Sequence, residues 1–71
     1  MPKHKRYSGK EIIEKLEYHG FRQIRQKGSH IVLKKITTEG EIGCVVPLHK
    51  EIAEGTLHAI LNQAKINLND F

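Results

Sequence analysis

Four consecutive residues have side chains that could act together on a phosphodiester: Lys27, Gly28, Ser29 and His30. Histidine exchanges protons near neutral pH, glycine lets a ligand approach the backbone closely, and a serine hydroxyl can donate a hydrogen bond to a phosphate oxygen. The surrounding stretch 18–38 contains no Asp or Glu and five cations, Arg22, Arg25, Lys27, Lys34 and Lys35. These types and spacings indicate acid–base chemistry at His30 on a bound polyanion, although most exposed histidines have no catalytic role.

The other candidates for chemistry give weaker indications. His49 follows Pro47 and Leu48 and could be a second proton carrier or an ordinary loop residue. His58 stands four residues after Glu54, a spacing typical of a side-chain pair on one helix face. The chain has no histidine pair at i,i+3 or i,i+4 and no CxxC motif, so the sequence predicts neither a metal site nor a cofactor.

Length and charge restrict the function further. A chain of 71 residues can form one domain, 1–71, with a small core, so any active site should be a shallow surface groove. A net charge of +4 and a pI near 9.4 favour a polyanionic partner (RNA, DNA or an acidic protein), and a solvated basic surface is the alternative. We find no secretory signal and no apolar run that could cross a membrane, and we expect a soluble, cytoplasmic protein with no membrane partner.

The elements that must position these residues follow the order α-β-β-β-α. Ser8 and Glu11 have the spacing of a capping box, which predicts a helix over 9–19 that ends at Gly20. A second helix is predicted over 53–65 because apolar residues recur there at helical spacing. Three strands are predicted over 21–26, 30–36 and 42–46, with a turn at 27–29, a polar loop at 37–41 and Pro47 after the last strand.

The segments at the two ends of the chain are assigned separately. We expect residues 1–7 to form a flexible basic N-terminus. The tail 66–71 could form one further turn, with Leu68 or Phe71 packing back on the core. The sequence thus predicts an α+β fold in which two helices cover one face of a three-stranded antiparallel sheet.

Strand alternation predicts which side chains face the helices. In strand 30–36, Ile31 and Leu33 share one side and His30 and Lys34 share the other. Ile31 and Leu33 bury more apolar surface than Val32 alone, so we expect them to face the helices and His30 to lie on the open side. Cys44 has the parity of Ile42 and Val46 and is predicted to be a buried hydrophobe rather than a nucleophile.

Three blocks of sequence, in this order, resemble the HicA (YcfA-like) toxin family. They are GF followed by RQKGSH (Gly20-Phe21 and 25–30), VPxH (46–49) and EGTLxxILxQA (54–64). The resemblance extends from about Ser8 to Ile66. It implies a fold like the double-stranded RNA-binding domain, ribosome-independent mRNA interferase activity, an essential histidine at position 30, and a HicB antitoxin that binds and blocks the toxin.

The chain departs from the family pattern at two positions. Lys65 stands where many members have a glycine after the second helix, so that helix could run on or end less cleanly. Ile31 stands where many members have a second histidine or an aromatic residue after the GSH triplet.

These observations lead to the hypothesis of a metal-independent endoribonuclease toxin with His30 as general acid or base. Its second proton carrier would be His49, with Lys27 as an electrostatic alternative. RNA would lie on the open face of the sheet, which would also be the docking surface of the antitoxin. The residues predicted to contact RNA are Arg22, Arg25, Lys27, Gly28, Ser29 and Lys34.

Two alternatives belong to other functional classes. A non-catalytic double-stranded RNA-binding module would fit the fold and the charge equally well and would need no histidine. An adaptor for an acidic protein would show no salt-dependent affinity for RNA.

Overall fold

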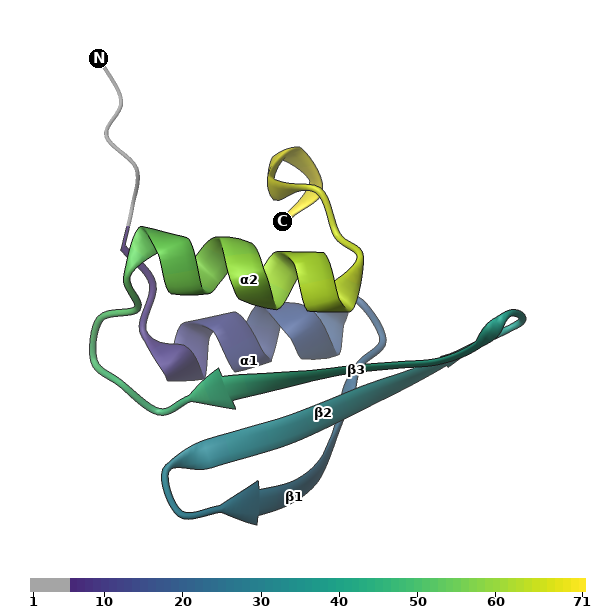
Figure 1. Ribbon diagram of the computed structural model, residues 1–71, viewed down its shortest axis with the longest axis horizontal. Helices are drawn as coiled ribbons and strands as arrows, with labels where there is room; N and C mark the ends of the chain where they lie inside the picture. The colour runs from purple at the N-terminus through teal and green to yellow at the C-terminus, as the bar shows by residue number, and fades with distance from the viewer. Residues whose placement is uncertain (1–5) are drawn as a thin grey trace.

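The computed structural model describes residues 6–71, which form two α-helices, three strands and a short 3-10 helix (Figure 1). In chain order these are α1 (Gly9–Tyr18), β1 (Arg22–Lys27), β2 (His30–Thr37), β3 (Gly40–Pro47), α2 (Glu54–Ala64) and η1 (Leu68–Asp70). The predicted order α-β-β-β-α is confirmed. Residues 1–5 of the predicted flexible segment 1–7 lie outside the described residues, whereas the carbonyl of Tyr7 accepts a hydrogen bond from the Ile52 N–H at 2.7 Å.

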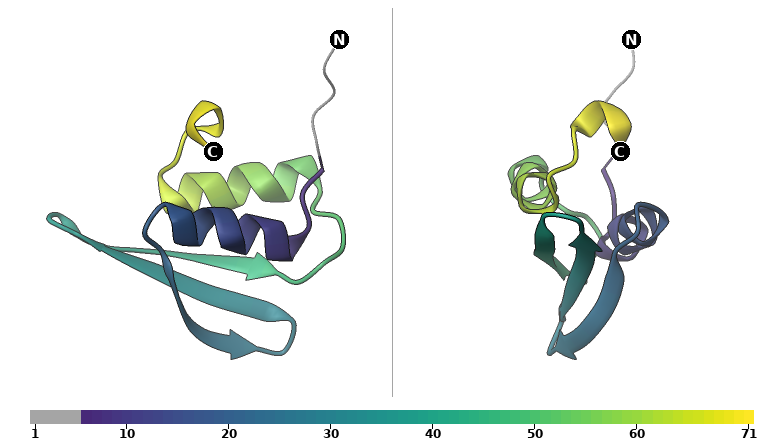
Figure 2. Two further views of the ribbon diagram at one scale, coloured as in Figure 1. Left: turned by 180° about the vertical axis from the view of Figure 1, so that it is seen from behind. Right: turned by 90° about the vertical axis from the view of Figure 1, so that its right-hand side faces the viewer.

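The sheet is antiparallel, in the strand order β1-β2-β3, and only one of its faces is buried. Ile31 and Leu33 of β2 and Cys44 and Val46 of β3 are at most 4% exposed and pack with the apolar sides of both helices. Figures 1 and 2 show α1 and α2 beside β3, whereas the tip of the β2–β3 hairpin extends past the ends of the helices. The predicted α+β arrangement, with His30 and Lys34 on the uncovered side, is therefore confirmed.

The capping box predicted for α1 is present. The Ser8 hydroxyl accepts a hydrogen bond from the Glu11 N–H at 3.0 Å, and the Glu11 carboxylate accepts one from the Ser8 N–H at 2.9 Å. At the other end, the N–H groups of Gly20 and Phe21 donate to the carbonyls of Glu17 and Leu16. This is a Schellman motif, in which Gly20 adopts a φ of +100° that only glycine reaches without strain.

Helix α2 ends in the same motif with a lysine in place of the glycine. The N–H groups of Lys65 and Ile66 donate to the carbonyls of Asn62 and Leu61, and Lys65 has a φ of 59° and a ψ of 42°. The helix predicted over 53–65 is one residue shorter at each end and does not run on past Ala64, and α1 likewise ends one residue before the predicted position 19. The hydrogen bonds and the packing of Ile66 on the core hold Lys65 in the left-handed region despite its Cβ.

Five of the six strand boundaries differ from the prediction by one or two residues. Three strands end one residue later than predicted, at Lys27, Thr37 and Pro47, so Pro47 is the last residue of β3 rather than the residue after it. β1 begins at Arg22, because Phe21 is 2% exposed and fills the core below the end of α1. β3 begins at Gly40 rather than at residue 42, so the predicted polar loop at 37–41 is a tight turn. The Thr37 hydroxyl stabilises that turn by accepting from the Glu39 N–H and donating to the Gly40 carbonyl.

The tail forms the further turn that was predicted, as η1. Phe71 is the residue that packs back, in edge contact with the ring of Tyr7 at 5.7 Å between centroids. Leu68, the other candidate, is 39% exposed.

Candidate nucleic-acid interface

The open face is the side of the sheet that the helices leave uncovered, and it carries His30 and most of the predicted RNA contacts. The register pairs Lys27 with His30, Arg25 with Val32, and Arg22 with Lys34 across β1 and β2. Directly opposed residues of an antiparallel pair point to the same side, with Cβ atoms about 4.5–5.5 Å apart. All of these charged residues and His30 are exposed. Lys27 is thus the immediate cross-strand neighbour of the imidazole.

A β-bulge in β1 brings both arginines to this face. The register shifts between Gln23 and Arg25, so Ile24 is an additional residue without a partner in β2. In a regular strand Arg22 and Arg25, three positions apart, would point to opposite sides. The bulge adds one step, so both point away from the helices. It also explains the poor alternation of this segment in the sequence.

The turn before His30 consists of Gly28 and Ser29. Gly28 has a φ of +61°, and no atom lies within 4 Å of the position where a Cβ would be, so its backbone is open to a ligand. The Gly28 carbonyl accepts a hydrogen bond from the Gln26 side chain at 2.9 Å. The Ser29 hydroxyl makes no hydrogen bond within residues 6–71, which leaves it able to donate to a phosphate oxygen.

The loop after β3 brings His49 to the same end of the sheet as His30. Pro47 pairs with His30, and the Leu48 N–H donates to the Ser29 carbonyl at 2.7 Å. This hydrogen bond therefore joins the residue before His30 to the residue before His49. Both imidazoles are exposed. The predicted antiparallel pairing of strands 30–36 and 42–46 already places these two segments at one end of the sheet, and this hydrogen bond, between positions 19 residues apart, holds them together.

Gly9 fixes this loop to the start of α1, a role that the sequence analysis did not identify. Its N–H donates to the His49 carbonyl at 2.8 Å, and a Cβ at position 9 would collide with the carbonyl oxygen of Pro47. A glycine directly after an N-cap serine was the available signal. Its helical position, however, gave no reason to expect a close contact with a distant loop.

The predicted cations differ in their surroundings. The Lys34 ammonium lies 3.5 Å from a carboxylate oxygen of Glu41, whereas Arg22, Arg25 and Lys27 form no ion pair within residues 6–71. Lys35 points to the covered side, where its ammonium lies 5.9 Å from the centre of the Phe21 ring.

The surroundings of Cys44 argue against a role as a nucleophile. It is 3% exposed, and burial raises the pKa of its thiol from 9.0 to about 11, so the thiolate is scarce at neutral pH. Within the part of the chain that the structure describes, no group of three His, Cys, Asp or Glu side chains could hold a metal ion.

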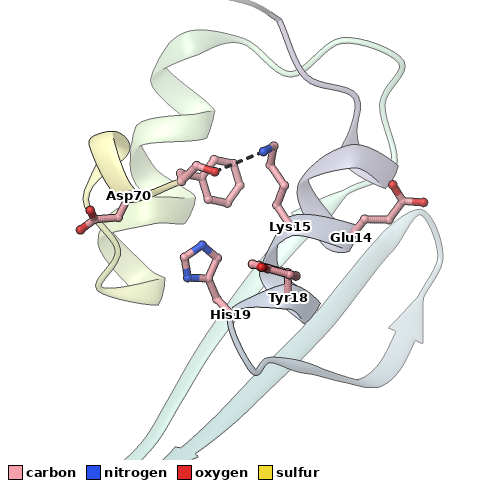
Figure 3. A pocket seen from close by; sticks show the side chains of 6 residues that line it. Glu14, Lys15, Tyr18, His19 and Asp70 are labelled. Atoms are coloured by element: carbon pink, nitrogen blue, oxygen red, sulfur yellow. Dashed lines mark hydrogen bonds between the residues drawn. The ribbon is translucent and has the colours of Figure 1, made fainter.

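A surface hollow of about 320 Å³ lies on the helical side of the molecule, between α1 and the C-terminal turn (Figure 3). Its lining residues are Glu14, Lys15, Tyr18, His19, Asp70 and Phe71. The His19 and Phe71 rings stack at 6.2 Å, and the Lys15 ammonium donates to the Phe71 carbonyl at 3.2 Å. None of the residues predicted to act on RNA lines this hollow. They lie on β1 and β2, in the turn between these strands and in the loop after β3.

Comparison with known proteins assigns the chain to a family. The family model for the HicA toxin of bacterial toxin–antitoxin systems matches residues 9–66, which include both helices and all three strands. Searches of the curated proteins and of the solved structures gave no match. Among residues 6–71, no helix combines the length and the apolar character needed to cross a membrane.

Proposed function

The chain belongs to the HicA toxin family and is the toxin of a toxin–antitoxin system with an antitoxin partner, and we propose that it is an endoribonuclease that cleaves mRNA. The observation that carries the proposal is the position of His30. Its imidazole lies on an exposed face, directly opposite Lys27. Arg25 is the next residue of β1 on the same face. A phosphate bound by these cations would lie beside an imidazole, the side chain that enzymes use most often as a general acid or base.

The proposed reaction is transesterification by the RNA itself. The ribose 2′-oxygen attacks the adjacent phosphorus while a base takes its proton, and the bond from phosphorus to the 5′-oxygen breaks as that oxygen gains a proton. The products are a 2′,3′-cyclic phosphate and a 5′-hydroxyl. His30 serves as the base or as the acid, and either role contributes roughly 10²–10⁴-fold in rate. The chemistry requires no metal ion.

The second proton carrier in this proposal is His49. The hydrogen bond between Leu48 and Ser29 supports it, because it holds the two histidine-bearing segments together at one end of the sheet. Gly28 and Ser29 would contact the phosphate through the open backbone and the unpaired hydroxyl. Lys27, directly opposite His30, is the electrostatic alternative to His49.

We further propose that the antitoxin is HicB-like and docks on the open face. A partner that covers His30 and neutralises the cations around it would block substrate access in the simplest way. The proposed site of action is the cytoplasm, where mRNA is present.

The experiment is cleavage of end-labelled RNA in EDTA by the wild type and by His30→Ala. We expect the variant to lose at least about 10²-fold in rate and to keep its fold, because an exposed imidazole contributes little to stability. His58→Ala is the matched control, since His58 is exposed on α2, away from the open face. His49→Ala is expected to reduce the rate as well.

Cleavage by His30→Ala at the wild-type rate would refute the catalytic assignment. RNA binding without product in either protein would select the non-catalytic binding module. The absence of salt-dependent binding would refute RNA as the substrate. Binding of the antitoxin by His30→Ala, measured in parallel, would show that the variant is folded and that its docking surface is intact.

A further inference from the structure

The charges on the open face are divided unequally among the strands. β1 contributes Arg22, Arg25 and Lys27, which are exposed and form no ion pair within the described residues. β2 contributes Lys34, and β3 contributes no cation and one acid, Glu41. The positive potential of this face is therefore concentrated along β1, the strand that leads to the turn before His30.

Lys34 is already engaged. Its ammonium lies 3.5 Å from Glu41, and the two side chains are 46% and 60% exposed. A phosphate bound at Lys34 would have to displace this carboxylate and then remain next to it. A phosphate bound at the three cations of β1 would displace no carboxylate and would have none beside it, because no acid contacts these cations within residues 6–71.

The far end of the open face is unsuited to a polyanion. Glu41 lies directly opposite Ile36, which is 81% exposed, and the turn beyond them carries the exposed Glu39. At the near end, His30 lies opposite Lys27. The face thus changes along its length from cationic at the His30 end to apolar and acidic at the hairpin tip.

From this distribution we propose that the RNA strand follows β1 across the open face to His30, and that Glu41 excludes RNA from the far half of the β2–β3 hairpin. Glu41 is then a positioning residue, and Lys34 is its ion-pair partner rather than a phosphate contact. The inference rests on the proposed function and narrows the set of contacts predicted from the sequence.

The test is binding of a fluorescent 2′-O-methyl RNA, which lacks the attacking hydroxyl and cannot be cleaved, measured by anisotropy over a range of salt concentrations. Arg25→Ala should reduce the slope of log affinity against log salt by about 0.7, the value for one lost phosphate contact with a single strand. Lys34→Ala should change affinity by less than about twofold, because the pair that it breaks is exposed.

Glu41→Gln should bind up to about fivefold more tightly, the equivalent of one exposed ion pair that no longer competes. Glu39→Gln is the matched control and should change affinity by less than about twofold. In the Glu41→Gln background the released ammonium becomes a contact, so adding Lys34→Ala should reduce the salt slope by about 0.7.

A loss from Lys34→Ala in the wild type as large as that from Arg25→Ala would overturn the inference. An affinity of Glu41→Gln no higher than that of Glu39→Gln would also overturn it. Either result leaves the proposed function intact, provided that the wild type binds RNA in a salt-dependent manner. Failure of the wild type to bind would instead refute the proposed function and, with it, the inference.

Discussion

The two faces of the sheet come from alternate residues of the same strands but obey different constraints. On the covered face, Leu33 and Val46 are fully buried and contact both the sheet and the helical layer. On the open face, His30 and Arg25 are exposed and do not belong to the hydrophobic core. One face therefore determines whether the chain folds, and the other can change its chemistry with little effect on stability. Single substitutions at neighbouring positions can separate stability from activity.

The largest expected contrast is between Leu33→Ala and Val32→Ala. Truncation of the fully buried Leu33 should lower the free energy of unfolding by about 2–5 kcal/mol, a large part of the stability of a chain this small. The half-buried Val32 on the open face should cost under about 1.5 kcal/mol. Urea unfolding monitored by circular dichroism measures both, and equal losses would show that the two faces are not distinct.

The second contrast concerns ionisation of the buried Cys44 thiol on the covered face. Burial raises the pKa of Cys44 from 9.0 to about 11, so the unfolded chain loses its thiol proton at lower pH than the folded chain. The neutral thiol makes its full contribution to the free energy of unfolding below pH 9. This contribution falls by up to about 2.7 kcal/mol as the pH rises through 11.

Cys44→Ala removes this dependence, so the difference between wild type and variant isolates it from the titration of lysines and tyrosines. At pH 8 the wild type should have the higher free energy of unfolding. This difference should shrink as the pH rises and reverse by pH 11. A difference that stays constant over this range would show that the thiol is accessible to water.

The third contrast tests the contact between the start of α1 and the His49 loop. Gly9→Ala places a methyl group against the Pro47 carbonyl and should cost about 1–3 kcal/mol, because the start of α1 and the His49 loop must move apart. Gly55→Ala is the control, since its added Cβ in α2 would meet no atom within 4 Å outside the adjoining helix backbone, and it should be neutral or stabilising by up to about 1 kcal/mol. Cleavage assays on the same proteins should show a defect only for Gly9→Ala.

The smallest expected effect is a gain. Lys65→Gly relieves a left-handed conformation in the helical layer and should raise stability by about 0.5–1 kcal/mol. Lys65→Asn should fall between glycine and lysine, because asparagine tolerates this region better than lysine does. Thermal unfolding measures the gain, and RNA cleavage should not change, since residue 65 is remote from the open face.

Much of the fold could be predicted from local patterns. The capping box of Ser8 and Glu11 and the parity of Ile31 and Leu33 are features of single elements, and the structure confirms both. The end of α2 was predicted incorrectly, because the hydrogen bonds of the Schellman motif and the packing of Ile66 outweigh the preference of lysine for a right-handed conformation.

The candidate site was less accessible to prediction, because its features depend on contacts between elements. The contact between the His49 loop and the His30 turn includes a backbone hydrogen bond between two connecting segments, in addition to the pairing of β2 with β3. The pairing of Lys34 with Glu41 depends on the register of β2 and β3, and the close contact at Gly9 depends on how α1 meets the loop. No local pattern encodes these relations.

The bulge at Ile24 has a consequence for chain length. The pairs on either side of it, Gln23 with Leu33 and Arg25 with Val32, would be successive pairs of a regular ladder if residue 24 were deleted. β1 can therefore lose one residue at this point while both arginines keep their orientation. We expect alignments of related toxins to show a one-residue gap here, with the outward-facing cations retained on both sides of it.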